Sequence, residues 1–133
     1  MAKVITNGIV PNGLNDLACL IYERNVEKGF YEKPKNIGEM LCLIHSEISE
    51  ALEADRNARY ALANMNVING WTNDKDFIYN YKEDIKGTFE EEMADVFIRL
   101  MDLCAYKGID IEAHVTAKMR YNLSREKYHG KNY

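Results

Sequence analysis

The sequence TFEEEMADVFIRLMDLC, residues 88–104, carries the clearest helical pattern of the chain. Its apolar residues recur every three or four positions, which is typical of an amphipathic helix. Thr88, followed three residues later by Glu91, has the sequence of a capping box, so we expect the helix to begin there. Glu92 and Asp95, three positions apart, border the apolar face. The segment therefore predicts a partly buried helix with an acidic row beside its core-facing side.

A second acidic row occurs in HSEISEALEADR, residues 45–56, where Glu47 and Glu50 are again three positions apart. Side chains at this spacing on a helix are neighbours, so like charges repel by a few tenths of a kcal/mol. A divalent cation removes that repulsion, and Mg²⁺ or Mn²⁺ prefers carboxylate oxygens. One such pair alone is usually a solvated helix face. Two rows bordering apolar faces predict a metal site made of Glu47, Glu50, Glu92 and Asp95.

Four helical patterns and no hairpin can be recognised, which predicts one all-α domain over residues 1–133 with a four-helix-bundle-like arrangement. The patterns cover residues 14–28, residues 36 to about 60, residues 88–108 and residues 110 to about 127. Asn36, Thr88 and Asp110 are expected to cap three of them, and Gly29 and Gly108 to end two. The short turn at residues 107–109 predicts that the last two helices are antiparallel neighbours.

Residues 64–87 form an insertion between the two acidic helices, rich in Asn, Asp and Tyr, in which we expect a short helix at most. Its Trp71, Tyr79 and Tyr81 could stack on a nucleobase, although such aromatics more often dock on their own domain. A brief extended piece is predicted at residues 3–6.

Composition narrows the class of protein. The chain has 133 residues, 47% of them hydrophobic and 29% charged, and a net charge of -4, which argues against binding a nucleic-acid duplex. No apolar run approaches the roughly 20 residues of a membrane span, and the first residues lack an export signal, so a cytoplasmic location is expected. Cys19, Cys42 and Cys104 lie in apolar helical patterns without metal-ligand spacing, which predicts reduced thiols in the core.

The last helical pattern carries Lys118, Asn122 and Arg125, spaced i, i+4 and i+7. On one continuous helix they would present an ammonium, an amide and a guanidinium on one face, and these groups bind phosphate. The alternative is a solvated basic helix end that complements the helix dipole.

Three segments, LIHSEISEALEADR, FEEEMADVFIRLMDLCAYKGIDIE and KMRYNLSREKYHGK, together resemble the MazG-like family of all-α nucleoside triphosphate pyrophosphohydrolases, relatives of the dimeric dUTPases. The resemblance implies Mg²⁺-dependent hydrolysis of (deoxy)nucleoside triphosphates to the monophosphate and pyrophosphate, serving to cleanse the nucleotide pool, by a dimer or tetramer. The gap between Glu50 and Glu92 is longer than is usual in the family, so the insertion is expected to alter the nucleobase pocket.

The resemblance also implies roles for individual residues. The metal ligands would be Glu47, Glu50, Glu92 and Asp95, and the phosphate contacts Lys118, Asn122 and Arg125. Lys118 and Arg125 would stabilise charge developing on the phosphates. Glu91 would support the metal ligands or act as general base, and Glu47 and Glu50 are further candidates for accepting the proton of the attacking water.

A different class of function also fits the pattern. In this reading the chain is a non-catalytic helical-bundle module, its acidic faces are solvated, and its amphipathic helices dimerise or bind a partner helix. Release of pyrophosphate from triphosphates in the presence of Mg²⁺ separates the two hypotheses.

Overall fold

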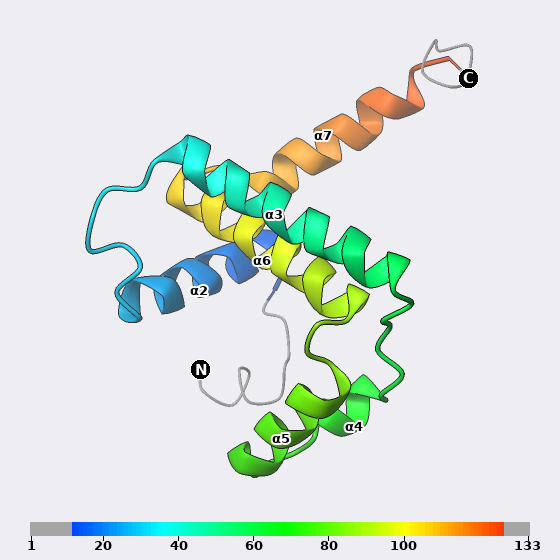
Figure 1. The fold of residues 1–133 in the computed structure, drawn as a ribbon. Helices are drawn as coiled ribbons and strands as arrows, with labels where there is room; N and C mark the ends of the chain where they lie inside the picture. Colours follow the sequence, from blue (N-terminus) through cyan, green and yellow to red (C-terminus); the bar gives the residue numbers. More distant parts are fainter. Residues whose placement is uncertain (1–11, 127–133) are drawn as a thin grey trace.

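A computed structural model describes residues 12–126, and in that range it contains six helices and no strand (Figure 1). They are α2 (Leu14–Glu27), α3 (Ile37–Arg56), α4 (Met65–Asn69), α5 (Asp74–Asp84), α6 (Phe89–Tyr106) and α7 (Ile111–Leu123). The predicted all-α class is confirmed. None of these helices combines the length and the apolar character that crossing a membrane requires. The extended piece predicted at residues 3–6 lies outside the described residues.

The predicted helix starts are confirmed by side-chain caps. Asn36, Thr88 and Asp110 each accept a hydrogen bond from the backbone N–H three residues later, at the starts of α3, α6 and α7. These bonds satisfy N–H groups that have no partner inside the helix.

Three helices end with a residue of positive φ two positions past the last helical residue. Gly29 (φ +85°) and Gly108 (φ +65°) end α2 and α6 as predicted. Ala58 (φ +52°) ends α3 in the same way, with the Arg59 N–H bonded to the Ala54 carbonyl at 2.9 Å. The predicted end near residue 60 was therefore too late, because an alanine gives no sequence signal for this turn.

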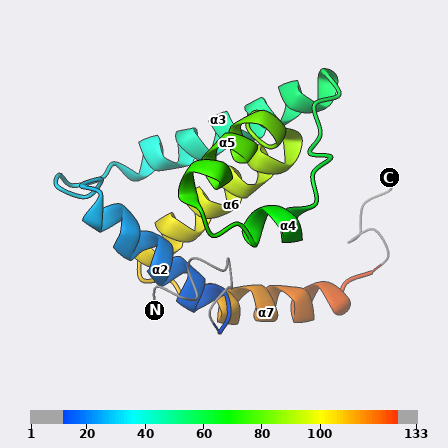
Figure 2. The ribbon, with the colours of Figure 1, turned by 90° about the horizontal axis from the view of Figure 1, so that it is seen from below.

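α6 is the central helix, and both α3 and α2 pack against it (Figures 1 and 2). Ala18 of α2 meets Met101 and Cys104 of α6 in the core cluster. Ala51 and Ala54 are the buried apolar residues of α3, and their small size lets α3 lie close to α6. Close packing brings the two acidic rows to one interface.

The predicted position of the cysteines is only partly correct. Cys104 is buried in the core, whereas Cys19 and Cys42 are exposed on α2 and α3, and all three are free thiols. The prediction failed for Cys19 and Cys42 because an apolar pattern marks a helix face whether or not another helix covers it. Among the described residues, no helix covers these two positions.

α7 does not complete a four-helix bundle. It diverges from α6 and projects away from the other helices, and none of its residues is buried (Figures 1 and 2). The prediction that the last two helices are antiparallel neighbours along their length was wrong. The helix also ends at Leu123, so Arg125 lies beyond it.

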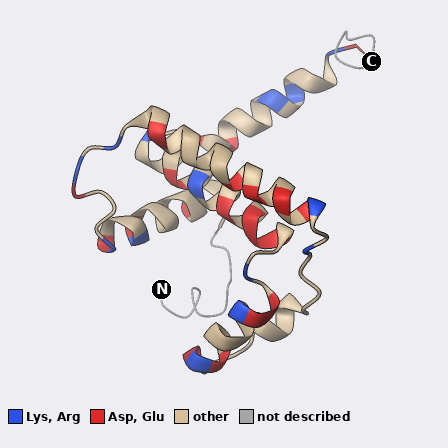
Figure 3. Ribbon diagram, in the orientation of Figure 1, with Lys and Arg blue, Asp and Glu red and all other residues tan. Residues whose placement is uncertain are grey.

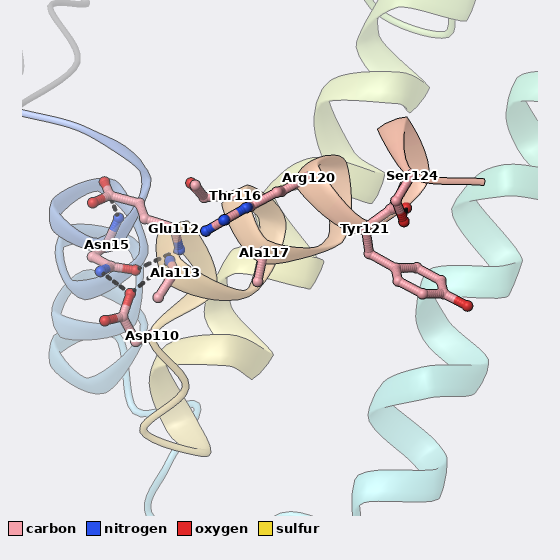
Figure 4. A pocket seen from close by; sticks show the side chains of 9 residues that line it. All are labelled: Asn15, Asp110, Glu112, Ala113, Thr116, Ala117, Arg120, Tyr121 and Ser124. Carbon is pink, nitrogen blue, oxygen red and sulfur yellow. Dashed lines mark hydrogen bonds between the residues drawn. The ribbon is translucent and has the colours of Figure 1, made fainter.

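The direction of α7 is set by its first turn, which is hydrogen-bonded to the start of α2 (Figure 4). The Asn15 amide donates to Oδ1 of Asp110 at 2.8 Å, and the backbone N–H of Asn15 donates to Oε1 of Glu112 at 3.1 Å. The Glu112 N–H in turn donates to Oδ1 of Asn15 at 3.3 Å. Each helix thus caps the other, which favours an outward course for α7 over packing along α6.

The insertion holds two helices, α4 and α5, where a short one at most was expected. They pack against each other beyond the ends of α3 and α6 that carry the acidic rows (Figure 1). Ile68 and Ile85 are the buried anchors of this unit.

Candidate functional site

A cavity of about 440 Å³ lies between the second half of α3 and the first half of α6. Acidic residues are frequent in these parts of the two helices (Figure 3). Residues from α3, α6 and the segment between them line the cavity: Glu47, Glu50, Glu53, Arg59, Lys86, Gly87, Glu91, Glu92 and Asp95. All five acidic residues that the sequence marked as candidates are among them. Helix packing and the spacing of the two rows together create this cavity.

Three of the four predicted metal ligands converge. Glu47, Glu50 and Glu92 each offer one oxygen, and these atoms lie within 4.8 Å of one another. Asp95 lines the same cavity but falls outside this close group. The convergence of these three oxygens defines a candidate metal site.

The electrostatics of the cluster follow from burial. Glu47 and Glu92 are each only 8% exposed. Burial raises the pKa of the Glu92 carboxyl, and the neighbouring charges of Glu50, Glu91 and Glu47 raise it further. Burial and Glu47 likewise raise the pKa of Asp95. A cation in the cavity would relieve both effects.

Arg99 is a partner of the cluster that sequence reasoning missed. Its Nε donates to Oε1 of Glu47 at 2.7 Å, joining α6 to α3. The sequence could have indicated this contact, because Arg99 follows Asp95 by one helical turn and lies on the same helix face as the acidic row.

Glu91 faces the insertion. One of its carboxylate oxygens accepts a hydrogen bond from the Tyr81 hydroxyl at 2.7 Å, and the other accepts one from the Gly87 N–H. Burial and the bond to Glu91 raise the pKa of Tyr81, so its hydroxyl stays protonated and donating. The expected capping box is thus displaced, since Glu91 reaches back to Gly87 and not to Thr88. These contacts favour the supporting role over that of general base.

The other aromatic residues of the insertion lie elsewhere. Trp71 is 40% exposed and lines a separate cavity between α4 and α5, and Tyr79 is exposed. Stacking of these rings on a base, the alternative to docking on their own domain, stays untested.

The predicted phosphate-binding residues do not line the acidic cavity. Lys118, Asn122 and Arg125 belong to α7 and the residues just after it. The Lys118 Nζ lies 4.9 Å from the ring centroid of Tyr121, and the Arg125 guanidinium carbon lies 5.7 Å from it. Within one chain the structure groups these two cations around Tyr121 and does not bring them to the carboxylates.

A further cavity, of about 850 Å³, follows the exposed side of α7 from the Asn15 junction to Ser124 (Figure 4). Its lining includes Arg120 and Tyr121 but none of the predicted phosphate-binding residues.

Comparison of the chain with protein-family models, with curated proteins and with solved structures found no match in any of the three. The evidence for function is therefore the geometry of the chain's own residues.

Proposed function

We propose that this protein is a Mg²⁺-dependent nucleoside triphosphate pyrophosphohydrolase with a MazG-like helical arrangement. The observation that carries the proposal is the convergence of Glu47, Glu50 and Glu92 from two helices to within 4.8 Å. The family resemblance of the sequence motifs gives the reaction class, and the cavity supplies the place for it.

The residues fit the proposed cation. Oxygens around an octahedral Mg²⁺ are about 3 to 4.2 Å apart, since each lies about 2.1 Å from the metal. The three carboxylate oxygens, within 4.8 Å of one another, need only a small contraction to reach that spacing. All donors are hard oxygens, which suits Mg²⁺ or Mn²⁺ and disfavours softer metals. Asp95 is close enough to line the same cavity as a further ligand.

Different residues of the cavity would have different roles in the reaction. A bound Mg²⁺ would neutralise charge on the phosphate oxygens. It would also lower the pKa of a bound water, so that the water loses a proton more readily and becomes a better nucleophile. Glu50 is the most exposed of the three clustered carboxylates, whereas Glu47 is engaged by Arg99. Glu50 is therefore the best placed to accept the proton of the water. The water oxygen then adds to the α-phosphorus, the α–β anhydride bond breaks, and pyrophosphate leaves with the bonding electrons.

A homo-oligomer is part of the proposal. The described residues contain a single fully buried large side chain, Met101, while twelve large hydrophobic side chains of α3, α6 and α7 are exposed. They are Leu41, Leu43, Ile48 and Leu52 of α3, Met93, Phe97, Ile98 and Leu100 of α6, and Val115, Met119, Tyr121 and Leu123 of α7. A second copy of the chain would cover them, and its projecting α7 would supply Lys118, Asn122 and Arg125 to an acidic cavity.

The same exposed faces favour the second candidate function, a non-catalytic helical module. In that case the faces bind another helix and the acidic cavity has no substrate.

Pyrophosphate release separates the two candidates. The full chain is incubated with canonical and modified triphosphates, with and without Mg²⁺. Glu50→Ala and Asp95→Ala are expected to abolish Mg²⁺-dependent release while the helical circular-dichroism signal is retained. Glu23→Gln, which changes an exposed carboxylate on α2, is the matched control and should leave release unchanged. No release from any triphosphate, and no thermal stabilisation by Mg²⁺, would favour the non-catalytic module.

A further inference from the structure

Two cations line the acidic cavity and come from the segment that joins α3 to α6, which includes the insertion. Arg59 lies in the link between α3 and α4, and Lys86 lies between α5 and α6. Both side chains are exposed at the cavity that six carboxylates line. Among residues 12–126 the salt bridge within 4.0 Å is Arg99–Glu47, so neither Arg59 nor Lys86 forms a direct ion pair with the adjacent acids.

The backbone of Arg59 is fixed at the rim of the cavity. Its N–H donates to the Ala54 carbonyl at the end of α3, and its carbonyl accepts from the Phe89 N–H at the start of α6, both at 2.9 Å. Arg59 thus bridges the two helices that carry the acidic rows.

Lys86, near the end of the insertion, lies at the same rim. Its N–H donates to the Tyr81 carbonyl at 3.0 Å, and the next residue, Gly87, is bound to the Glu91 carboxylate. A Cβ atom at Gly87 would lie 3.8 Å from Nη1 of Arg59. The Arg59 guanidinium therefore lies beside the residue that follows Lys86, so the two cations approach one place.

The charges around the cavity point to a ligand with two kinds of group. The clustered carboxylates can bind a cation, Arg59 and Lys86 can bind an anion, and no ion pair within 4.0 Å joins one set to the other. A polyphosphate carrying a divalent metal satisfies both sets at once. Arginine binds phosphate oxygens through its planar fork, and lysine adds a compact charge.

We propose that Arg59 and Lys86 bind the phosphate oxygens of the metal-bound polyphosphate, so that the two ends of the segment joining α3 to α6 form a phosphate clamp within the same chain. This inference rests on the proposed function. It gives the phosphates cationic contacts from the same chain as the carboxylates, independently of α7.

Binding of inorganic tripolyphosphate tests the clamp without the need for turnover. The full chain is titrated calorimetrically with Mg²⁺ alone and, with Mg²⁺ present, with tripolyphosphate. Arg59→Gln and Lys86→Gln are each expected to weaken tripolyphosphate binding by about tenfold or more, because each removes a charge-assisted contact. Mg²⁺ binding should be retained. Lys82→Gln, an exposed lysine of α5 outside the cavity, is the matched control.

The Arg59→Lys variant is the control for a structural defect at this position. It keeps the positive charge, so it should recover part of the affinity that Arg59→Gln loses, which a merely structural defect would not do. Unchanged tripolyphosphate affinity in the Arg59→Gln, Lys86→Gln double variant would overturn the clamp. If the wild type still releases pyrophosphate in that case, the proposed function stands without it. If the wild type neither binds tripolyphosphate nor releases pyrophosphate, both proposals fail.

Discussion

The Nε atom of Arg99 donates to Oε1 of Glu47 at 2.7 Å, across the interface of α6 and α3. One of the predicted metal ligands therefore already has a cationic partner. The Arg99 side chain is 42% exposed, so solvent screens the pair and its contribution to stability is modest, about 1 kcal/mol or less. Metal binding at Glu47 would compete with this ion pair.

Arg99→Leu is accordingly expected to affect the protein differently with and without Mg²⁺. Without the metal, the melting temperature should fall slightly, because the buried Glu47 carboxylate loses its partner. With Mg²⁺, the thermal shift should exceed that of the wild type, because the metal no longer displaces an arginine. Arg24→Leu, an exposed position on α2, controls for the loss of a surface charge. Equal Mg²⁺ shifts in Arg99→Leu and wild type would show that Glu47 does not bind the metal.

Glu92→Gln is expected to stabilise the metal-free protein at pH 7. Burial and four neighbouring carboxylates raise the pKa of Glu92 in the folded state. The folded state therefore binds a proton more readily than the unfolded chain, so this group stabilises the fold at low pH and the benefit is lost as the pH rises through the folded pKa. Removing the charge should add a few tenths of a kcal/mol or more at pH 7.

Thermal melts in a chelating buffer measure this effect. The advantage of Glu92→Gln over wild type should disappear below the ordinary carboxyl pKa of 4.5, where the wild-type side chain is protonated in both states. The same variant should lose the stabilisation by Mg²⁺ that the wild type shows. A variant less stable than wild type at pH 7 without metal would contradict the electrostatic description of the cavity.

Ala58→Gly is expected to stabilise α3, by about 0.5–1 kcal/mol, because Ala58 holds a left-handed conformation that costs a residue with a Cβ roughly 1 kcal/mol. Gly108 offers the reciprocal experiment. It ends α6 in the same conformation, and a Cβ added there meets no atom within 4 Å. Gly108→Ala should therefore destabilise by a similar amount through backbone strain alone, as measured by urea unfolding. Shifts of the same sign in the two variants would refute the common turn geometry.

The local features of this fold were readable from the sequence. Asn36, Thr88 and Asp110 indicated where three helices start, because an N-cap depends only on a short polar side chain and the turn that follows it. The acidic rows were equally local, and packing of α3 on α6 brought them together as expected. Ala58 was missed because its turn is imposed on a residue that does not prefer it.

The tertiary contacts of the site were not readable in the same way. Arg59 and Lys86 reach the cavity because the segment joining α3 to α6 leaves and returns there, and no periodic pattern relates them to Glu47 or Glu92. The course of α7 depends on the bonds of Asn15 to residues far along the chain. Sequence spacing therefore identified the acidic residues of the cavity and could not identify the cations beside them.

The junction of α2 and α7 gives a further, pH-dependent prediction. Hydrogen bonds from the Asn15 amide and then from the Ala113 N–H lower the pKa of Asp110 below its ordinary value of 3.8. The unfolded chain therefore takes up this proton first as the pH falls. The stabilisation is complete above the ordinary pKa and is lost as the pH falls through the folded value.

Asn15→Ala should consequently lower the melting temperature at pH 7, and the difference from wild type should shrink between pH 5 and pH 3. The Asp110→Asn background provides the control, because asparagine still caps a helix but does not titrate. In that background the effect of Asn15→Ala should no longer vary with pH, since a double-mutant cycle isolates the Asn15–Asp110 bond. A pH-dependent effect of Asn15→Ala that persists in the Asp110→Asn background would contradict the assignment of this titration to Asp110.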